Sequence, residues 1–224
     1  MRVRIVEIGM LGPIEARDGD GTRLVVPGGR PLTLLALLLT RRGSVVSPRF
    51  AADALWPGRP PKDPANALQL SVSRLRKALG GVDSRPASPG YGVIASVPGG
   101  YVLRLPVGWT DADQFESLAA AGRAQLARGE PAEAAATLRR ALGLWRGPAL
   151  AEVRDEPFAR PVIERLDRLR MAVLSDRIDA DLALGRHSVL AGELEALAGE
   201  HPLDDRLRAQ LLAAGAHPGV RPAS

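Results

Sequence analysis

The chain has 224 residues, 46% hydrophobic and 25% charged, a composition typical of a folded protein with one large domain or two ordinary ones. It contains no cysteine, which excludes disulfide bonds and thiolate metal sites. The net charge of +5 is uneven, because residues 1–106 carry 15 Lys and Arg against 7 Asp and Glu, and residues 107–224 carry 15 against 18. We therefore expect two domains, of which the basic one meets a polyanion.

No segment of the sequence predicts export or membrane insertion. The longest apolar run, at residues 32–39, is far too short to span a bilayer. The first residues, MRVRIVEIG, alternate between polar and apolar types and lack the continuous apolar core of a signal peptide. These features predict a cytoplasmic protein, and its basic half predicts association with the nucleoid.

The basic half begins with a small predicted antiparallel sheet. Three strands bounded by Gly-Pro and Asp-Gly turns are expected at residues 3–11, 14–17 and 22–26. Strong helix formers with a proline in the first turn then predict a helix over residues 31–41. A second helix, over residues 48–56, is expected to begin after Ser47 as its N-cap, with Pro48 at its first position.

A third helix, expected over residues 65–79 after Asp63 and Pro64, has two contrasting faces. A narrow apolar stripe that should face a core consists of Leu68, Val72, Leu75 and Leu79. The polar face has no carboxylate and is formed by Asn66, Gln69, Ser73, Arg74, Arg76 and Lys77, with Leu70 among them. A hairpin over residues 93–105 follows and closes the basic half.

Strands, three helices and a hairpin form an α+β winged helix-turn-helix, and this half of the chain resembles the OmpR type. The resemblance is carried by the N-terminal sheet, by SVSRLRKAL as recognition helix and by SVPGGYVL as wing. It implies DNA contacts from Leu70, Ser71, Ser73, Arg74 and Arg76. Basic side chains attract phosphates, and Arg or amide groups can pair with base edges. On these grounds the candidate DNA-binding residues also include Asn66, Gln69, Lys77, Arg49 and Tyr101.

The wing departs from the OmpR pattern, in which a basic residue often precedes the glycine-containing turn. Here the turn reads VPGGY, and no Lys or Arg follows until Arg104. Minor-groove reading is therefore not expected, although Tyr101 could reach a phosphate. An alternative reading also stays open, in which Arg76 and Lys77 form only a solvated face and Leu70 packs against a neighbouring domain.

Beyond residue 106 the sequence predicts an all-α domain similar to tetratricopeptide repeats. Helix pairs are joined at Gly129 and Gly185, and a leucine follows nine residues after each glycine, at Leu138 and Leu194. The segment from Thr110, TDADQFESLAAAGRAQLARGEPAEAAATLRRALGLWRGPAL, resembles the bacterial transcriptional activation domain. That domain follows an OmpR-type domain in the Streptomyces antibiotic regulatory protein (SARP) family.

The family resemblance implies a sequence-specific transcriptional activator, for example of secondary-metabolite genes. Such a protein would bind double-stranded DNA at direct repeats near promoters and recruit RNA polymerase; self-association on DNA is left open. We place the DNA-binding domain at residues 1–106, an activation domain shorter than the family's at 107–214, and a disordered tail at 215–224. The competing hypothesis is a protein-interaction scaffold with a degenerate winged helix that no longer reads DNA.

The last helix is expected to expose an apolar face formed by Leu203, Leu207 and Leu211, because no further helix can follow to cover it. We therefore expect this helix to be marginal, or to offer an apolar patch for self-association or for polymerase.

Other chemistry in the sequence is sparse. There is no G-x-x-x-x-G-K-[ST] phosphate loop. The scattered histidines His187, His201 and His217 lack metal-ligand spacing and are expected at the surface. The acidic groups at expected helix starts are interpreted as caps: Asp111, Asp113, Asp204 and Asp205. We therefore expect no enzyme activity, no cofactor and no metal.

Overall fold

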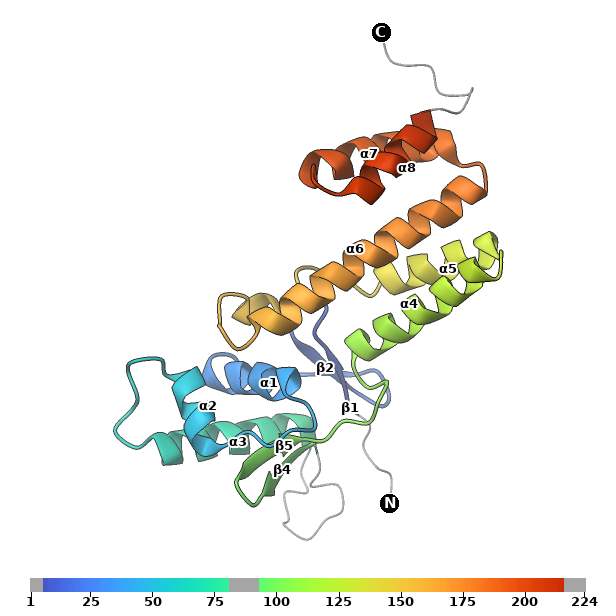
Figure 1. Ribbon diagram of the computed structural model, residues 1–224. Helices are drawn as coiled ribbons and strands as arrows, with labels where there is room; N and C mark the ends of the chain where they lie inside the picture. The colour runs from blue at the N-terminus through green and yellow to red at the C-terminus, as the bar shows by residue number, and fades with distance from the viewer. Residues whose placement is uncertain (1–5, 81–92, 216–224) are drawn as a thin grey trace. The chain divides into compact units, whose positions relative to one another are not determined.

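The computed structural model describes residues 6–80 and 93–215, and the chain forms two compact units (Figure 1). The first unit combines residues 1–114 with residues 145–166, and the second combines residues 115–144 with residues 167–224. This division differs from the expected boundary at residue 106, because a segment from the second half of the chain packs with the first half.

The first unit contains the expected sheet, helices and hairpin. Its elements are β1 (Val6–Gly9), β2 (Glu15–Asp18), β3 (Arg23–Leu24), α1 (Arg30–Thr40), α2 (Pro48–Leu55), α3 (Pro64–Gly80), β4 (Ile94–Val97) and β5 (Gly100–Leu103). The first three strands form an antiparallel sheet in the order β1-β2-β3, with Val6 opposite Asp18 and Ala16 opposite Leu24. The first strand is shorter than expected, and residues 3–5 lie outside the described residues.

Helix α1 lies at the centre of the first unit's core. Leu34, Leu35, Leu37 and Leu38 are completely buried, as expected for a helix that is apolar around most of its circumference. Both α2 and α3 pack against α1, and Figure 1 shows these helices gathered with the β4–β5 hairpin. The predicted cap of α2 is confirmed, because the Ser47 hydroxyl accepts a hydrogen bond from the Phe50 N–H.

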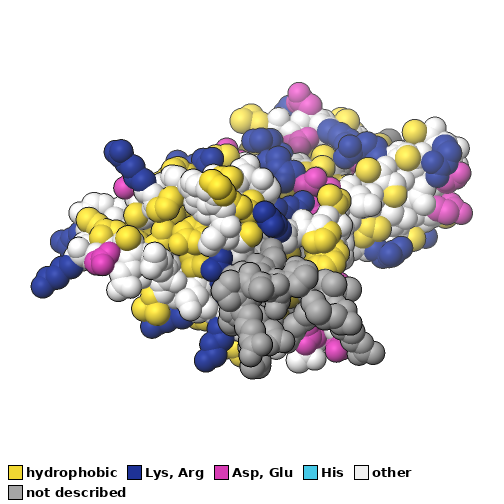
Figure 2. Space-filling view, turned by 90° about the horizontal axis from the view of Figure 1, so that it is seen from below, with side chains coloured by type: hydrophobic (Ala, Val, Ile, Leu, Met, Phe, Trp, Pro, Cys, Tyr) yellow, Lys and Arg dark blue, Asp and Glu magenta, His cyan; other side chains and the backbone are white. Residues whose placement is uncertain are grey.

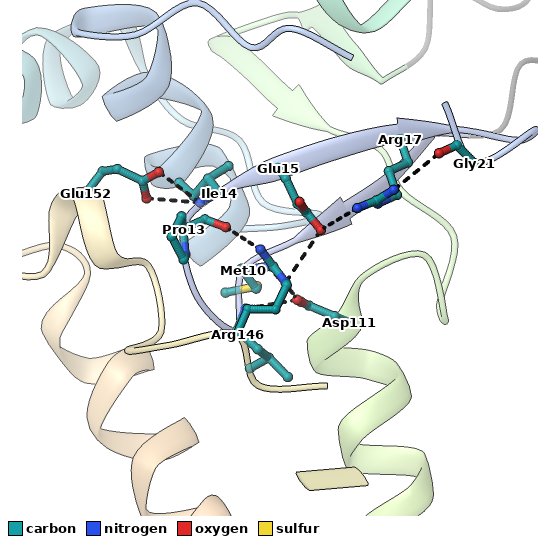
Figure 3. Close-up of polar contacts among 10 residues, drawn as sticks. Met10, Pro13, Ile14, Glu15, Arg17, Gly21, Asp111, Arg146 and Glu152 are labelled. Carbon is teal, nitrogen blue, oxygen red and sulfur yellow. Dashed lines mark hydrogen bonds and ion pairs between the residues drawn. The ribbon is translucent and has the colours of Figure 1, made fainter. Parts of the chain in front are cut away.

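Residues 146–152, which we call the docking segment, belong to the first unit although they lie far along the chain (Figure 3). The Arg146 N–H donates to the Leu11 carbonyl at 2.8 Å, and the Leu150 N–H donates to the Met10 carbonyl at 2.9 Å. The Glu152 carboxylate accepts the Ile14 N–H through both oxygens at 3.0 Å. The docking segment therefore supplies hydrogen bonds to the backbone that follows β1.

Asp111 and Asp113 lie in the first turn of their helix, where a carboxylate favours the dipole as expected, but neither residue is the N-cap. Thr110 caps α4 (Asp111–Ala127), because its hydroxyl accepts from the Asp113 N–H at 3.0 Å. The Asp111 carboxylate instead accepts the N–H groups of Met10 and Leu11, at 2.7 and 3.0 Å, and a hydrogen bond from Arg146.

Asp113 is likewise committed to a distant partner, because Arg42 donates to it through two nitrogens. Partial burial acts to raise the pKa of Asp113, but the hydrogen bonds with Arg42 and Thr110 outweigh burial and hold the pKa below its ordinary value. A carboxylate at a helix start can therefore serve long-range contacts as well as the local dipole.

Most of the second unit is helical, and glycines end helices at the two predicted positions. Besides most of α4, it contains α5 (Pro131–Leu142), most of α6 (Arg160–Ala183), α7 (His187–Glu200) and α8 (Asp205–Gly215), while a short 3-10 helix, η1 (Ala151–Val153), belongs to the first unit. Gly129 and Gly185 both have a left-handed φ of 74°. In both turns the residue after the glycine donates its N–H to a carbonyl five positions earlier. The matched leucines, Leu138 and Leu194, are both completely buried, as their repeated spacing suggested.

A buried carboxylate joins three helices of the second unit. The Asp181 carboxylate of α6, which is almost completely buried, accepts hydrogen bonds from Arg139 of α5 and from Arg186 at the start of α7, at 2.5 and 2.7 Å. Arg177, one turn earlier in α6, lies 3.4 Å from the same carboxylate. Burial acts to raise the pKa of Asp181, but these arginines hold it below its ordinary value.

The expectation that the last helix exposes an apolar face is wrong for Leu207, the middle residue of that face. Leu207 of α8 is completely buried in a cluster with Ile178, Leu190 and Leu194, and Leu211 packs against the same cluster. Leu203 lies before α8 begins and is 92% exposed. Asp204 is the cap that was expected, since it accepts the N–H groups of Arg206 and Leu207. Apart from Gly215, the expected tail lies outside the described residues.

The remaining expectations concern membranes and histidines. None of the helices within the described ranges is long and apolar enough to cross a membrane. His201 is exposed and His187 is half-buried at the start of α7, while His217 lies outside the described residues. No group of His, Asp or Glu in the described part of the chain is arranged to hold a metal ion.

Candidate nucleic-acid interface

Helix α3 is fixed on one side and open on the other. Its predicted apolar stripe is confirmed, because Leu68, Val72, Leu75 and Leu79 are all buried. Its start is capped by Asp63, whose carboxylate accepts the Asn66 N–H at 3.0 Å. Since one face is fixed in the core, the opposite face must point away from it, and there the exposed side chains are Asn66, Gln69, Leu70, Ser73, Arg74 and Lys77.

The exposed face of α3 is cationic and rich in hydrogen-bonding groups. With about 100° of rotation per residue, Asn66, Leu70, Ser73 and Lys77 fall within about 60° of one another around the helix axis. Arg74 and Lys77 make no ion pair with any other residue that the structure describes, so both charges are available to a ligand. Figure 2 shows dark blue Lys and Arg side chains projecting around hydrophobic patches on the face seen from below.

The wing is anchored to the chain just before α2. In the β4–β5 hairpin Ser96 lies opposite Tyr101, and the backbone of Tyr101 exchanges two hydrogen bonds with Val46, at 2.8 and 3.0 Å. Gly100 makes this approach possible, because a Cβ atom there would lie 2.1 Å from the Val46 carbonyl oxygen and its φ is +153°. Tyr101 is half-buried, so its side chain is only partly available to a phosphate.

The side chains of two predicted DNA-contacting residues make hydrogen bonds within the protein instead. Ser71 is only 5% exposed, and its hydroxyl donates to the Ala67 carbonyl one turn earlier at 2.9 Å. Arg76 is half-buried, and it donates to the Ile94 carbonyl and to the Ser96 hydroxyl, both at 2.9 Å. Ser71 therefore offers no exposed side chain to a ligand, and Arg76 ties α3 to the wing instead of standing free on the polar face.

Two basic residues, Arg41 at the end of α1 and Arg49 at the start of α2, complete the candidate surface. Arg49 is exposed in the first turn of α2, as expected, and makes no ion pair within the described residues. The sequence did not single out Arg41, whose guanidinium lies over the Phe50 ring at 4.4 Å from its centre. Its neighbour Arg42 pairs with Asp113 instead. The adjacent arginines Arg41 and Arg42 indicate a basic site in the sequence, but the sequence does not show which of the two remains exposed.

Comparison with known proteins identifies the type of protein that carries this surface. Residues 110–223 match the bacterial transcriptional activator domain family. The chain is 36% identical over 213 residues to the regulatory protein DnrI of Streptomyces peucetius, an alignment that covers 93% of this chain and 77% of DnrI. It is 38% identical to the regulatory protein AfsR of Streptomyces coelicolor, with 93% of this chain and 20% of AfsR covered.

A solved structure extends the likeness to three dimensions. The Mycobacterium tuberculosis EmbR structure, in complex with a low affinity phosphopeptide, superposes with a TM-score of 0.83 at 33% identity. The superposition covers 95% of this chain and 55% of EmbR, so the chain spans about half the length of that relative. The matches to the activator domain and to these regulators together show that the chain belongs to the SARP family of transcriptional regulators.

Proposed function

We propose that this regulator binds double-stranded DNA in a sequence-specific manner, with α3 in a major groove. The observation that carries the proposal is the exposed face of α3, which has unpaired Arg74 and Lys77 and no carboxylate. A major groove admits an α-helix, and cations on its exposed side can neutralise phosphates. The proposed contacts from α3 come from Asn66, Gln69, Leu70, Ser73, Arg74 and Lys77.

Residues outside the exposed face of α3 have supporting roles in this proposal. Arg41 at the end of α1 and Arg49 at the start of α2 are proposed to contact the phosphate backbone, which positions a protein on DNA without reading its sequence. Arg76 is proposed to hold the wing against α3 through Ile94 and Ser96. Tyr101 is proposed to approach a phosphate from the wing.

The second half of the chain is proposed to act in transcriptional activation. We assign DNA binding to residues 1–106 and activation to residues 107–214, with helical hairpins similar to tetratricopeptide repeats. The two similar glycine turns, at Gly129 and Gly185, support that comparison. Membership of the SARP family supports an activator that binds direct repeats near promoters and recruits RNA polymerase, working at the nucleoid in the cytoplasm.

One observation favours a second candidate function. The turn between β4 and β5 carries no Lys or Arg, so this wing has no cation for a minor groove. A winged helix without DNA affinity would leave a protein-interaction scaffold, with the helical unit as its binding surface.

Salt dependence of DNA binding separates the two functions. Duplexes selected from a randomised pool by the purified full chain should bind with an affinity that falls as salt rises, by a logarithmic slope of about −0.9 for each phosphate neutralised. Lys77→Ala should reduce that slope by about one and weaken all duplexes alike. Arg74→Ala should cost about 1–3 kcal/mol and relax specificity at one base pair if Arg74 pairs with guanine.

The matched control is Arg140→Ala, since Arg140 is an exposed arginine on α5, outside the candidate surface. It should leave both the affinity and the slope unchanged. Failure to recover any duplex, or binding that does not depend on salt, would contradict DNA binding and favour the scaffold.

A further inference from the structure

We infer that Leu70 reads the 5-methyl group of a thymine in the major groove and thereby sets part of the sequence preference. This inference rests on the proposed DNA binding by α3 and adds the type of base pair that the helix selects. It starts from an apolar side chain in an unusual place, since Leu70 is 50% exposed in the middle of a cationic face.

The position of Leu70 on α3 is central. It lies about 6 Å along the helix axis from both Asn66 and Arg74, since each is four residues away. It also lies nearly opposite the buried stripe of Leu68, Val72, Leu75 and Leu79. A helix that enters a groove with this face first brings Leu70 to the base edges, while residues at the borders of the face meet the phosphates.

The surroundings of Leu70 favour a small apolar contact over a broad one. Its neighbours on the exposed face of α3 are amide, hydroxyl and cationic groups: Asn66, Gln69, Ser73, Arg74 and Lys77. A docking surface for an apolar protein partner would need further apolar side chains beside it. A thymine methyl is a single apolar group surrounded by hydrogen-bonding base edges, and it matches one leucine among polar neighbours.

The two amides beside Leu70 point to the same type of base pair. Asn and Gln can each form a bidentate pair with adenine N6 and N7, whereas neither is the usual partner of guanine. An A·T pair presents both that adenine edge and the thymine methyl in the major groove. Asn66 or Gln69 together with Leu70 can therefore read the A·T pairs at the centre of the contacted site.

The test is a double-mutant cycle, in which one change removes a methyl group from the DNA and the other shortens the Leu70 side chain. The probe is a duplex that the wild-type full chain selects from a randomised pool, remade with each thymine replaced in turn by uracil. Uracil pairs as thymine does but lacks the methyl group. We expect one replacement to weaken wild-type binding about fourfold, the value for one buried methyl group.

In the Leu70→Ala variant the same replacement should change affinity by less than about 1.5-fold, because the side chain that contacts the methyl is shortened. Leu70→Met should restore sensitivity to uracil. Val25→Ala, which shortens a different exposed apolar side chain of the first unit, should behave as the wild type. Equal melting temperatures for these variants would show that folding is unchanged.

The possible failures have different meanings. If a duplex is selected and bound in a salt-dependent way, but no replacement by uracil weakens binding, the role of Leu70 is wrong and DNA binding stands. The same holds if replacement by uracil weakens the wild type and Leu70→Ala equally. If no duplex is selected at all, both the proposed function and this inference are overturned.

Discussion

Replacing Asp111 by Asn should destabilise the first unit, because this carboxylate joins three parts of the chain (Figure 3). It accepts the backbone N–H groups of Met10 and Leu11, at 2.7 and 3.0 Å, and a guanidinium nitrogen of Arg146 at 2.9 Å. Its side chain is largely buried. Asn keeps the shape of the side chain but loses the charge and turns an NH2 group towards one of these donors.

The expected loss follows from these three contacts. A hydrogen bond to a charged group contributes about 1.5–3 kcal/mol, and the contact with the partly exposed Arg146 contributes less because water screens it. Since Asn can still accept from one of the two backbone donors, we expect a net loss of about 2–3 kcal/mol. For a chain of this length the melting temperature of the first unit should fall by about 4–12 °C.

Urea denaturation and thermal melting of the full chain measure this loss. The control is Asp20→Asn, because Asp20 is an exposed carboxylate in the turn between β2 and β3 of the same unit. It should change the unfolding free energy by less than about 0.5 kcal/mol. Equal effects of Asp111→Asn and Asp20→Asn would refute the idea that Asp111 holds the docking segment and β1 together.

Three further outcomes follow from the geometry. Gly100→Ala should destabilise the chain by about 1–3 kcal/mol in urea denaturation, because its φ is left-handed and a Cβ atom meets the Val46 carbonyl; an unchanged midpoint would contradict this. Arg76→Ala should weaken binding of selected duplexes by loosening the wing, and the β4–β5 amides should lose protection from hydrogen exchange; unchanged protection would mean that Arg76 does not anchor the wing. Because the folded pKa of Asp181 lies below its ordinary 3.8, its contribution to stability is present above that value and lost as the pH falls through the folded pKa. Asp181→Asn should therefore flatten the pH dependence of unfolding below about pH 5, and an unchanged slope would contradict the arginine contacts.

Local features of the fold were readable from the sequence because the interactions behind them are local. The helical period of Leu68, Val72 and Leu75 reports burial directly, and the caps at Ser47 and Asp63 depend on hydrogen bonds to residues three positions away. Most of the exposed residues of α3 follow from the same period, since they lie opposite the buried stripe.

Long-range contacts could not be predicted from the sequence, because they leave no pattern among neighbouring residues. Arg76 belongs by its charge to the polar face of α3, and only the fold brings Ile94 and Ser96 within its reach. Asp111 stands at a helix start, where the helix dipole already explains a carboxylate. Nothing nearby in the sequence reveals that it accepts the backbone N–H groups of Met10 and Leu11, which lie 101 and 100 residues away. Ser71 was assigned by resemblance, although its position beside Val72 and Leu75 already indicated the buried side of the helix.

The most direct measurement of the central claim uses the absence of cysteine from the chain. Ser73→Cys introduces one thiol on the exposed face of α3. Ser188→Cys introduces one thiol at an exposed position of α7. Each thiol is labelled with a reagent that cleaves nearby DNA, and the labelled chains are bound to a selected duplex. We expect cleavage centred on the major groove of the selected site from the label at position 73. Bound DNA that the label at position 73 leaves uncut, or that the label at position 188 cuts equally, would contradict α3 as the element that reads DNA.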